Sequence, residues 1–154
     1  NMFTIDYSKA QEFATITDGT YEVVIKSAKP DASKGGTDFM NIQFKIRDDF
    51  EQKFKNNLIF HKIWVSKETQ QYNSAQVNAL AKAAQLPDGA KYAGVEEFLN
   101  ALVGKHLKVT VRNEKSEYNG NTYENLNVKK LEKSSIMAPA QSAPIDLSED
   151  DLPF

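Results

Sequence analysis

The segment FMNIQFKIR, residues 39–47, carries the pattern from which the fold of this chain can be predicted. Its side chains alternate between two kinds. One set is apolar, and the other is mostly polar but includes the aromatic Phe39 and the cationic Lys45. An alternation with a period of two is typical of a β-strand that covers a core with one face and leaves the other face free. We expect Met40, Ile42, Phe44 and Ile46 to point inward.

Two further strands are predicted on either side of this segment. Upstream, Tyr21–Ala28 alternates in the same way, and Lys29–Asp38 is rich in Pro, Gly, Ser and Asp, which indicates a loop. Downstream, the pattern predicts a third strand over Phe54–Val65. One face of that strand carries Phe60, Lys62 and Trp64, and the other carries Ile59, His61, Ile63 and Val65. Both faces are fairly apolar, so the sequence does not decide which one points inward.

The hydrophobic period then changes to that of a helix. Ser74 is predicted to cap a helix that ends near Gln85, and a second helix is predicted over Val95–Leu102, with Gly104 beyond its end. Strands return at Lys105–Glu114 and Thr122–Leu131, and the dipeptide Asn119-Gly120 between them is a strong hairpin signal.

Three strands, a helical insert and two more strands are the order of an OB-fold. We therefore predict a mainly β domain, a five-stranded OB-fold barrel over residues 19–133 with the helices between strands three and four. Residues 1–18 are predicted to form a surface arm, with a short helix around Ser8–Phe13. Residues 134–154 change to Ser, Ala, Pro and Gln, which favours a disordered linker and acidic tail. A generic α+β sandwich is the alternative fold.

Charge is distributed unevenly along the chain. The net charge is −2, but residues 134–154 carry four acidic and no basic side chains, which leaves a net charge of +2 on residues 1–133. Cysteine is absent, so disulfides and thiolate chemistry are excluded, as expected in a reducing cytoplasm. No apolar run is long enough to span a membrane, and the first residues do not resemble a secretory signal.

Catalytic and metal-binding patterns are not found in the sequence. The Lys34-Gly35-Gly36 turn is too short for a phosphate-binding loop. His61 and His106 have no ligand-type neighbours at metal spacing, and Asp48, Asp49 and Glu51 are best interpreted as a solvated turn. We therefore expect a binding protein without a metal or cofactor rather than an enzyme.

Cations and aromatic residues on the predicted strands point to nucleic acid. Proteins that bind single strands combine a cationic groove with aromatic faces on which bases stack. In an OB-fold the second and third strands and the loops after the first and fourth strands contact the ligand. The alternative is that Phe60 and Trp64 belong to the core. The candidate single-stranded-DNA-binding residues are Lys26, Lys34, Phe39, Lys45, Phe60, Lys62, Trp64, Lys108, Arg112, Tyr118 and Tyr123.

The segment IDLSEDDLPF, residues 145–154, combines acidic residues with a hydrophobic-Pro-Phe end. It resembles the acidic tip of bacterial single-stranded-DNA-binding proteins. A ring of this kind can fill an apolar pocket while the acids steer the tail toward basic surfaces. The resemblance implies that replication, recombination or repair proteins dock on the tip, and the alternative is a tail that only aids solubility. The predicted partner-binding residues are Asp146, Glu149, Asp150, Asp151, Leu152, Pro153 and Phe154.

The body of the chain carries a second resemblance. The runs GTYEVVIKSAKPDASKGGTDFMNIQFKIRDD, Leu86-Pro87-Asp88-Gly89, LVGKHLKVTV and YNGNTYENL resemble a phage family associated with single-stranded-DNA binding and long described as a domain of unknown function. The likeness covers Gly19–Leu131. It implies an OB-fold, a role in phage DNA replication or recombination, and the cytoplasm of a bacterial host. It leaves open whether copies form a homo-oligomer. Alternative functions are a protein-interaction adaptor, an RNA- or oligosaccharide-binding OB module, or a phage nucleic-acid-processing enzyme.

Overall fold

The structure, a computed structural model, describes residues 3–5 and 15–136. The predicted helix around Ser8–Phe13 and the acidic tip therefore lie outside the described residues. Within them, the order of the elements agrees with the prediction of three strands, two helices and two strands. The elements are β1 (Gly19–Ala32), β2 (Asp38–Ile46), β3 (Leu58–Trp64), α1 (Ser74–Ala83), α2 (Val95–Leu102), β4 (His106–Tyr118) and β5 (Asn121–Lys133).

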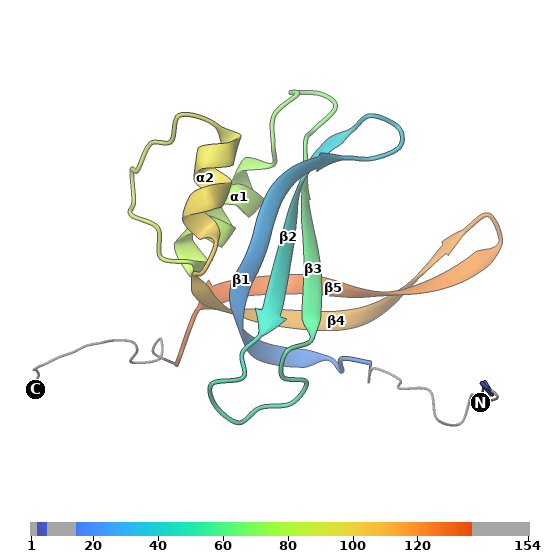
Figure 1. Cartoon of the computed structure of the whole chain (residues 1–154). Coiled ribbons are helices and arrows are strands. Elements are labelled where there is room, and N and C mark those ends of the chain that lie inside the picture. Colours follow the sequence, from blue (N-terminus) through green and yellow to red (C-terminus); the bar gives the residue numbers. More distant parts are fainter. Residues whose placement is uncertain (1–2, 6–14, 137–154) are drawn as a thin grey trace, which may run out of the picture.

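All five strands form one antiparallel sheet in the order β3-β2-β1-β4-β5. The sheet curls so that β4 and β5 pass across β1, β2 and β3, and the helices lie at one end (Figure 1). Bulges between Ile25 and Ser27 and between Thr110 and Val111 assist this bending. The predicted barrel is not closed, because no described residue of β3 pairs with β5 in the sheet. A seam between these two edge strands remains open.

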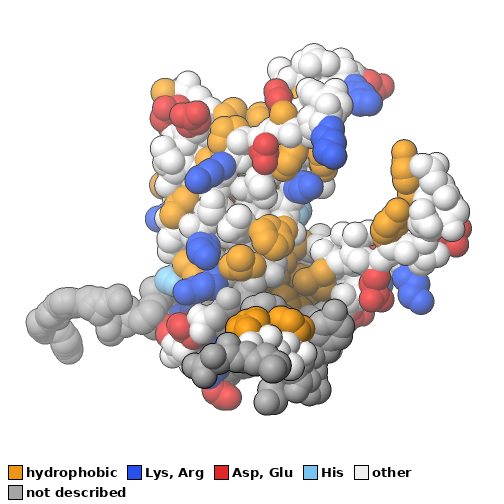
Figure 2. Space-filling view, turned by 45° about the vertical axis from the view of Figure 1, so that its right-hand side comes forward, with side chains coloured by type: hydrophobic (Ala, Val, Ile, Leu, Met, Phe, Trp, Pro, Cys, Tyr) orange, Lys and Arg blue, Asp and Glu red, His pale blue; other side chains and the backbone are white. Residues whose placement is uncertain are grey.

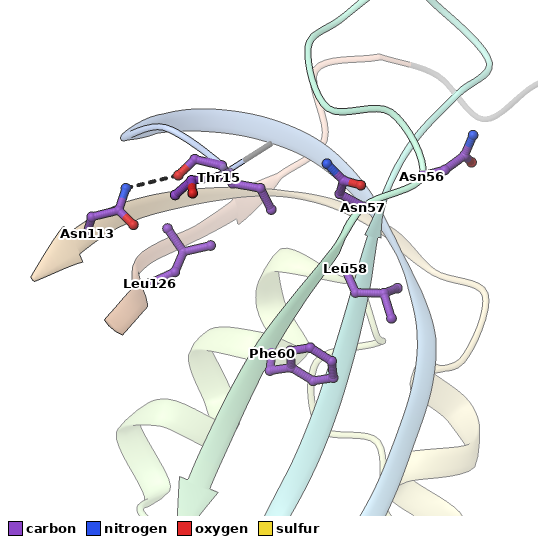
Figure 3. A pocket seen from close by; sticks show the side chains of 8 residues that line it. Thr15, Asn56, Asn57, Leu58, Phe60, Asn113 and Leu126 are labelled. Carbon is purple, nitrogen blue, oxygen red and sulfur yellow. Dashed lines mark hydrogen bonds between the residues drawn. The ribbon is translucent and has the colours of Figure 1, made fainter. Parts of the chain in front are cut away.

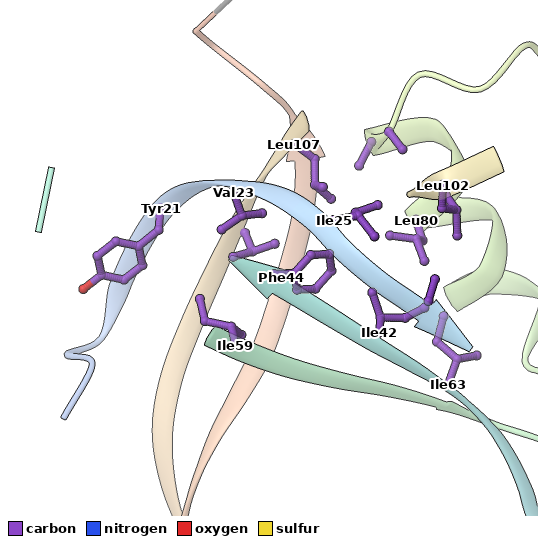
Figure 4. Close-up of a cluster of buried hydrophobic side chains, with 14 of the residues drawn as sticks. Tyr21, Val23, Ile25, Ile42, Phe44, Ile59, Ile63, Leu80, Leu102 and Leu107 are labelled. Atoms are coloured by element: carbon purple, nitrogen blue, oxygen red, sulfur yellow. The ribbon is translucent and has the colours of Figure 1, made fainter. Parts of the chain in front are cut away.

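The core lies inside the curl and includes one face of every strand. Met40, Ile42, Phe44 and Ile46 are buried as the alternation predicts. On the inward face of β3, Ile59 and Ile63 are fully buried and His61 is half-buried, whereas Phe60 and Trp64 point outward. Leu80 of α1 and Leu102 of α2 pack onto Ile25, Ile42 and Ile63 from the helical side (Figure 4). Burying one large aliphatic side chain contributes roughly 1.5–3 kcal/mol to the stability of the fold. The core that the helices and the sheet share therefore fixes the helices to the sheet.

Strand β1 is longer than predicted. Lys29–Ala32, assigned to a loop from composition, continue the strand and pair with Asp38–Asn41 of β2. Pro30 fits there because β4 pairs with β1 only over Gly19–Val24, so the distal half of β1 has a free edge. The loop between β1 and β2 is therefore confined to residues 33–37.

Two other boundaries differ from the prediction for local reasons. Strand β3 begins at Leu58 rather than Phe54, because Phe54 and Asn56 have positive φ angles of 62° and 70° and form a turn. Helix α1 is capped by Asn73, whose side chain accepts a hydrogen bond from the Gln76 amide at 3.0 Å, rather than by Ser74.

The hairpin between β4 and β5 turns at Asn119-Gly120, as predicted. Both residues have positive φ angles, 52° and 79°, which suit a two-residue turn whose twist matches the flanking strands. Strand β4 continues to Tyr118 and β5 begins at Asn121, so the hairpin extends well beyond the body of the sheet (Figure 1).

A buried arginine fastens the chain that follows β5 to the start of the sheet. Arg47 donates two hydrogen bonds to the Asp49 carboxylate, at 2.9 and 2.6 Å, and its Nη1 lies 3.9 Å from Glu22 Oε1. The same Nη1 donates to the Ile136 carbonyl at 3.0 Å. Glu22 in turn accepts hydrogen bonds from the Ser134 hydroxyl at 2.6 Å and the Ser135 amide at 2.9 Å.

We call this group, formed by Glu22, Arg47, Asp49 and residues 134–136, the Arg47 clasp. It places the first three residues of the segment assigned to the tail against β1 and β2. The Arg47 guanidinium and the Glu22 carboxylate are buried away from water. Each of these charged groups therefore depends on the other members of the Arg47 clasp for its hydrogen bonds.

We expect Arg47→Met to destabilise the protein by about 3–5 kcal/mol, since it leaves the Glu22 carboxylate buried without its cation. Urea unfolding followed by far-ultraviolet circular dichroism measures the change. The matched control is Lys55→Met, which removes an exposed i,i+4 pair with Glu51 and should cost less than about 1 kcal/mol. Equal effects of the two substitutions would show that the Arg47 clasp does not stabilise the fold.

Candidate nucleic-acid interface

The outward face of β2 and β3 brings together residues from the two strands in fixed pairs. The register places Phe39 opposite Trp64, Asn41 opposite Lys62 and Gln43 opposite Phe60. On the other side of β2, Lys29 of β1 lies opposite Asn41. One row across three strands therefore contains Lys29, Asn41 and Lys62, and it is flanked by aromatic residues on β3.

Trp64, Phe39 and Lys62 pack against one another on this face. The ring centroids of Phe39 and Trp64 lie 4.6 Å apart, and the Lys62 ammonium lies 4.9 Å from the Phe39 ring and 5.8 Å from the Trp64 ring. Phe39 is only 5% exposed, whereas Trp64 is 40% and Phe60 is 54% exposed. The Phe39 ring, a predicted stacking surface, is thus covered by its neighbours and supports Trp64 from below. Trp64 and Phe60 are the rings that a ligand can reach.

A groove runs along the open seam between β3 and β5. One wall carries Phe60, His61, Lys62 and Trp64, and the other is formed by Asn125–Lys129. The groove has a volume of about 550 Å³. It adjoins a second hollow in which Phe60 and Leu58 of β3 lie across from Leu126 of β5, with Asn113 of β4 beside it (Figure 3). The seam that leaves the barrel open therefore forms an elongated surface depression.

Two projections stand beside this groove. The loop of residues 33–37 leads directly into the Phe39 end of β2, and the β4–β5 hairpin extends from the other wall (Figure 1). Hydrophobic side chains gather between the two projections, and basic side chains lie on the upper one (Figure 2). Lys34, a predicted DNA-binding residue, is exposed in the loop of residues 33–37.

The hairpin carries the two predicted tyrosines on a single face. Tyr123 pairs with Ser116 and Tyr118 pairs with Asn121, so Tyr118 and Tyr123 are diagonal neighbours. They are 69% and 47% exposed. The two-residue period places Asn125 and Asn127 on the same face of β5, and Lys129, at the bulge, reaches Glu114 on that face. The tyrosines thus continue the β5 wall of the groove outward.

The other predicted cations lie at different distances from the groove. Lys108 donates a hydrogen bond to Ser135 Oγ at 2.7 Å and pairs across the strands with Glu22, so it belongs to the side of the Arg47 clasp. Arg112 is exposed on β4 opposite Asn127, at the outer rim. Lys26 is exposed on β1 beside its bulge, and Lys45 is half-buried on the outward face of β2. None of these four lines the groove.

Sequence patterns missed three polar residues at this surface. Lys29 was assigned to a loop from the composition of residues 29–38, although β1 continues through it and pairs it with Asn41 of β2. Asn41 was assigned only to a polar face, yet its Oδ1 is buried and has no hydrogen-bond partner among the described residues. Lys129 lines the groove and forms an ion pair with Glu114 at 3.1 Å.

Two titratable groups at the groove are held in one protonation state near neutral pH. Burial lowers the pKa of His61, whose ring stacks on Phe44 with centroids 6.2 Å apart, so the imidazole is neutral. Hydrogen bonds from Asn127 and Lys129 lower the pKa of Glu114, which remains ionised. Within residues 3–5 and 15–136 no three acidic or histidine side chains are grouped to hold a metal ion, and no helix there is long and apolar enough to cross a membrane.

The fold and the groove define a mainly β protein with one curled five-stranded antiparallel sheet and a surface seam. The chain belongs to the family described as "Protein of unknown function (DUF669)", whose model matches residues 3–144. No curated protein matches the sequence. Among solved structures, "Yeast RPA bound to ssDNA" is similar with 11% identity and a TM-score of 0.37, over 88% of this chain and 89% of that chain.

We expect the stability of the protein to fall as the pH is lowered from 7 to 5. Burial lowers the folded-state pKa of both His61 and His106 from 6.5, so in that range the unfolded chain binds more of these protons than the folded protein does. Asp49 and Glu114, whose pKa values are also lowered, lose their contribution only below about pH 4.5. The free energy of unfolding from urea titrations at each pH measures the effect. The substitution His61→Gln should reduce this pH dependence, and an unchanged dependence would contradict the assignment.

Proposed function

We propose that this protein binds single-stranded DNA in the groove between β3 and β5, with little preference for base sequence. The observation that supports this most directly is the outward face of β3, where exposed Phe60 and Trp64 flank Lys62. Exposed rings offer stacking surfaces for any base, and a lysine between them can contact a phosphate. The groove is open along the seam, which suits an extended strand rather than a compact ligand.

The geometry also suggests how the strand is held. Trp64 is fixed in place by the Phe39 ring and the Lys62 ammonium, so little side-chain freedom is lost when a base stacks on it. Lys29 and Lys129 add cations on either side, and the hairpin tyrosines extend the aromatic surface. We assign Lys34 and Arg112 to longer-range attraction of the phosphate backbone, because both are exposed beyond the groove walls.

The remaining elements of the proposal come from the sequence. The resemblance of the body to a phage family supports a role in phage DNA replication, recombination or repair inside a bacterial host. The acidic tip, Asp150–Phe154, supports recruitment of partner proteins. In this proposal the protein coats single strands and presents them to other proteins, and it catalyses no reaction itself.

We expect Trp64→Ala and Phe60→Ala each to weaken binding of a single-stranded oligonucleotide by about 1–3 kcal/mol. Fluorescence anisotropy of a labelled oligonucleotide measures the affinity, with duplex DNA and RNA of the same sequence as comparisons. Val103→Ala, an exposed apolar residue after α2, is the control and should leave affinity unchanged. Thermal melting shows whether each variant is folded. Equal affinity of the unaltered protein for duplex and single strand would refute the proposed function, and tighter RNA binding would favour the RNA module.

Two lysines provide a second test, because one lies in the β3–β5 groove and the other lies outside it. Lys62→Ala should weaken binding and reduce the slope of log affinity against log salt by about 0.7, the value for one lost phosphate contact on a single strand. Lys108→Ala removes the same charge on the side of the Arg47 clasp and should change the slope far less. Salt titrations of both variants decide this. Equal slopes for the two would place the DNA elsewhere than the β3–β5 seam.

A further inference from the structure

The outer surface of the helical insert carries a groove, lined by both apolar and polar side chains, that the proposed DNA site does not use. Val77 and Ala81 of α1, Leu86 and Pro87 of the following turn, and Tyr92 and Phe98 line a hollow of about 620 Å³. A neighbouring hollow shares Val77, Tyr92 and Phe98, so the two form one continuous depression, which we call the helical groove. The Tyr92 and Phe98 rings meet edge to face, with centroids 5.7 Å apart.

The helical groove lies next to the point where the C-terminal segment leaves the domain. Gln85, at the end of α1, lines one further hollow together with residues 134–136 of the Arg47 clasp. The next residues along the chain, Leu86 and Pro87, already line the helical groove. In Figure 1 the chain leaves β5 on the side of the helices, away from the β4–β5 hairpin.

Cations mark the path between these two points. Lys105 and Lys133 line the hollow beside the Arg47 clasp, and Lys82 lines the helical groove. The described residues that line these two hollows include three lysines and one carboxylate, that of Asp88, so positive charge is in excess there. A segment with acidic residues ahead of an apolar end fits this order of charges and apolar surface.

Residues 146–154, DLSEDDLPF, are such a segment. Leu152 lies sixteen positions after Ile136, a length that spans up to about 55 Å when extended, whereas the ten residues of α1 measure only about 15 Å. Tethering over so short a span raises the effective concentration of the segment at the groove to about the millimolar range. Pro153 limits the conformational freedom that docking has to remove.

We propose that Asp150–Phe154 docks in the helical groove of its own chain. Leu152 and Phe154 fill the hollow between Val77, Leu86 and Phe98, and Asp150 and Asp151 lie near Lys82. Docking at this place hides the apolar end of the tail and leaves the β3–β5 groove free. A partner protein must then compete with the helical groove for the tail. Docking within the chain therefore limits the fraction of molecules whose tail is free to bind a partner. This inference does not depend on DNA binding.

The experiment uses the absence of cysteine from the chain. A nitroxide spin label on Ser148→Cys, in otherwise unaltered full-length protein, broadens the NMR signals of amides that lie near the tail. We expect broadening at Val77, Ala81, Leu86 and Phe98 of the helical groove, and not at Phe60 or Trp64. Adding Phe154→Ser, or the exposed Lys82→Glu, should each reduce the broadening several-fold, whereas Lys55→Glu, in the loop between β2 and β3 at the end of these strands away from the helices, should not.

Three results would overturn the inference. Broadening confined to β3 and β5 would show that the tail occupies the proposed DNA groove instead. Uniform weak broadening would show that it has no docking site. A sample that mixes spin-labelled protein without ¹⁵N and ¹⁵N-labelled protein without a spin label tests for exchange between copies, and equal broadening there would assign the site to a second molecule. The affinity of the same proteins for an oligonucleotide is measured in parallel. A failure of tail docking can then be distinguished from a failure of the DNA-binding proposal.

Discussion

The two-residue period of the strands β1, β2 and β3 is the constraint on which both the core and the candidate site depend. Ile59 and Ile63 pair with Phe44 and Met40 on the inward face, and all four are buried. Because consecutive side chains alternate, this packing forces Phe60 and Trp64 to the outside. A register shift of one residue would exchange the faces and place Lys62 in the core. The burial of the apolar face therefore determines which side chains lie on the outer face. A change of register would alter both faces together.

The order of elements, the bounds of α2 and the Asn119-Gly120 hairpin could be predicted because each depends on local patterns. The inward face of β3 could not, since both of its faces are apolar and the choice is made by Leu80 and Leu102, which come from the helices. Arg47 could not be recognised as a buried residue, because its partners Ser134 and Ile136 lie almost ninety residues away. Phe39 was correctly placed on the outward face, but its cover by Trp64 depends on the register.

The seam between β3 and β5 and the helical groove divide the surface of one small domain into two regions. The seam combines exposed rings with lysines, whereas the helical groove combines apolar and polar side chains, with lysines along its approach. Strand β5 connects the two, since its hairpin end carries Tyr123 and its other end leads into the Arg47 clasp. At about 3.3 Å per residue, its thirteen residues separate these ends by roughly 40 Å. The seam itself lies nearer to the clasp, because Lys129 of the seam and Lys133 beside the Arg47 clasp are four residues apart on this strand, roughly 13 Å.

The Arg47 clasp has a mechanical consequence. Any tension applied to residues beyond Ile136 reaches the domain first through the Ile136 carbonyl and the Ser135 amide, and from there passes to Arg47 and Glu22. Arg47 directly follows β2, and Glu22 lies on β1. Both strands lie inside the sheet, with a neighbouring strand on each side. The load is thus spread into two strands that are each paired on both sides, instead of peeling β5 away from β4, its neighbour in the sheet. A pull on the tail would leave the β5 wall of the groove in place.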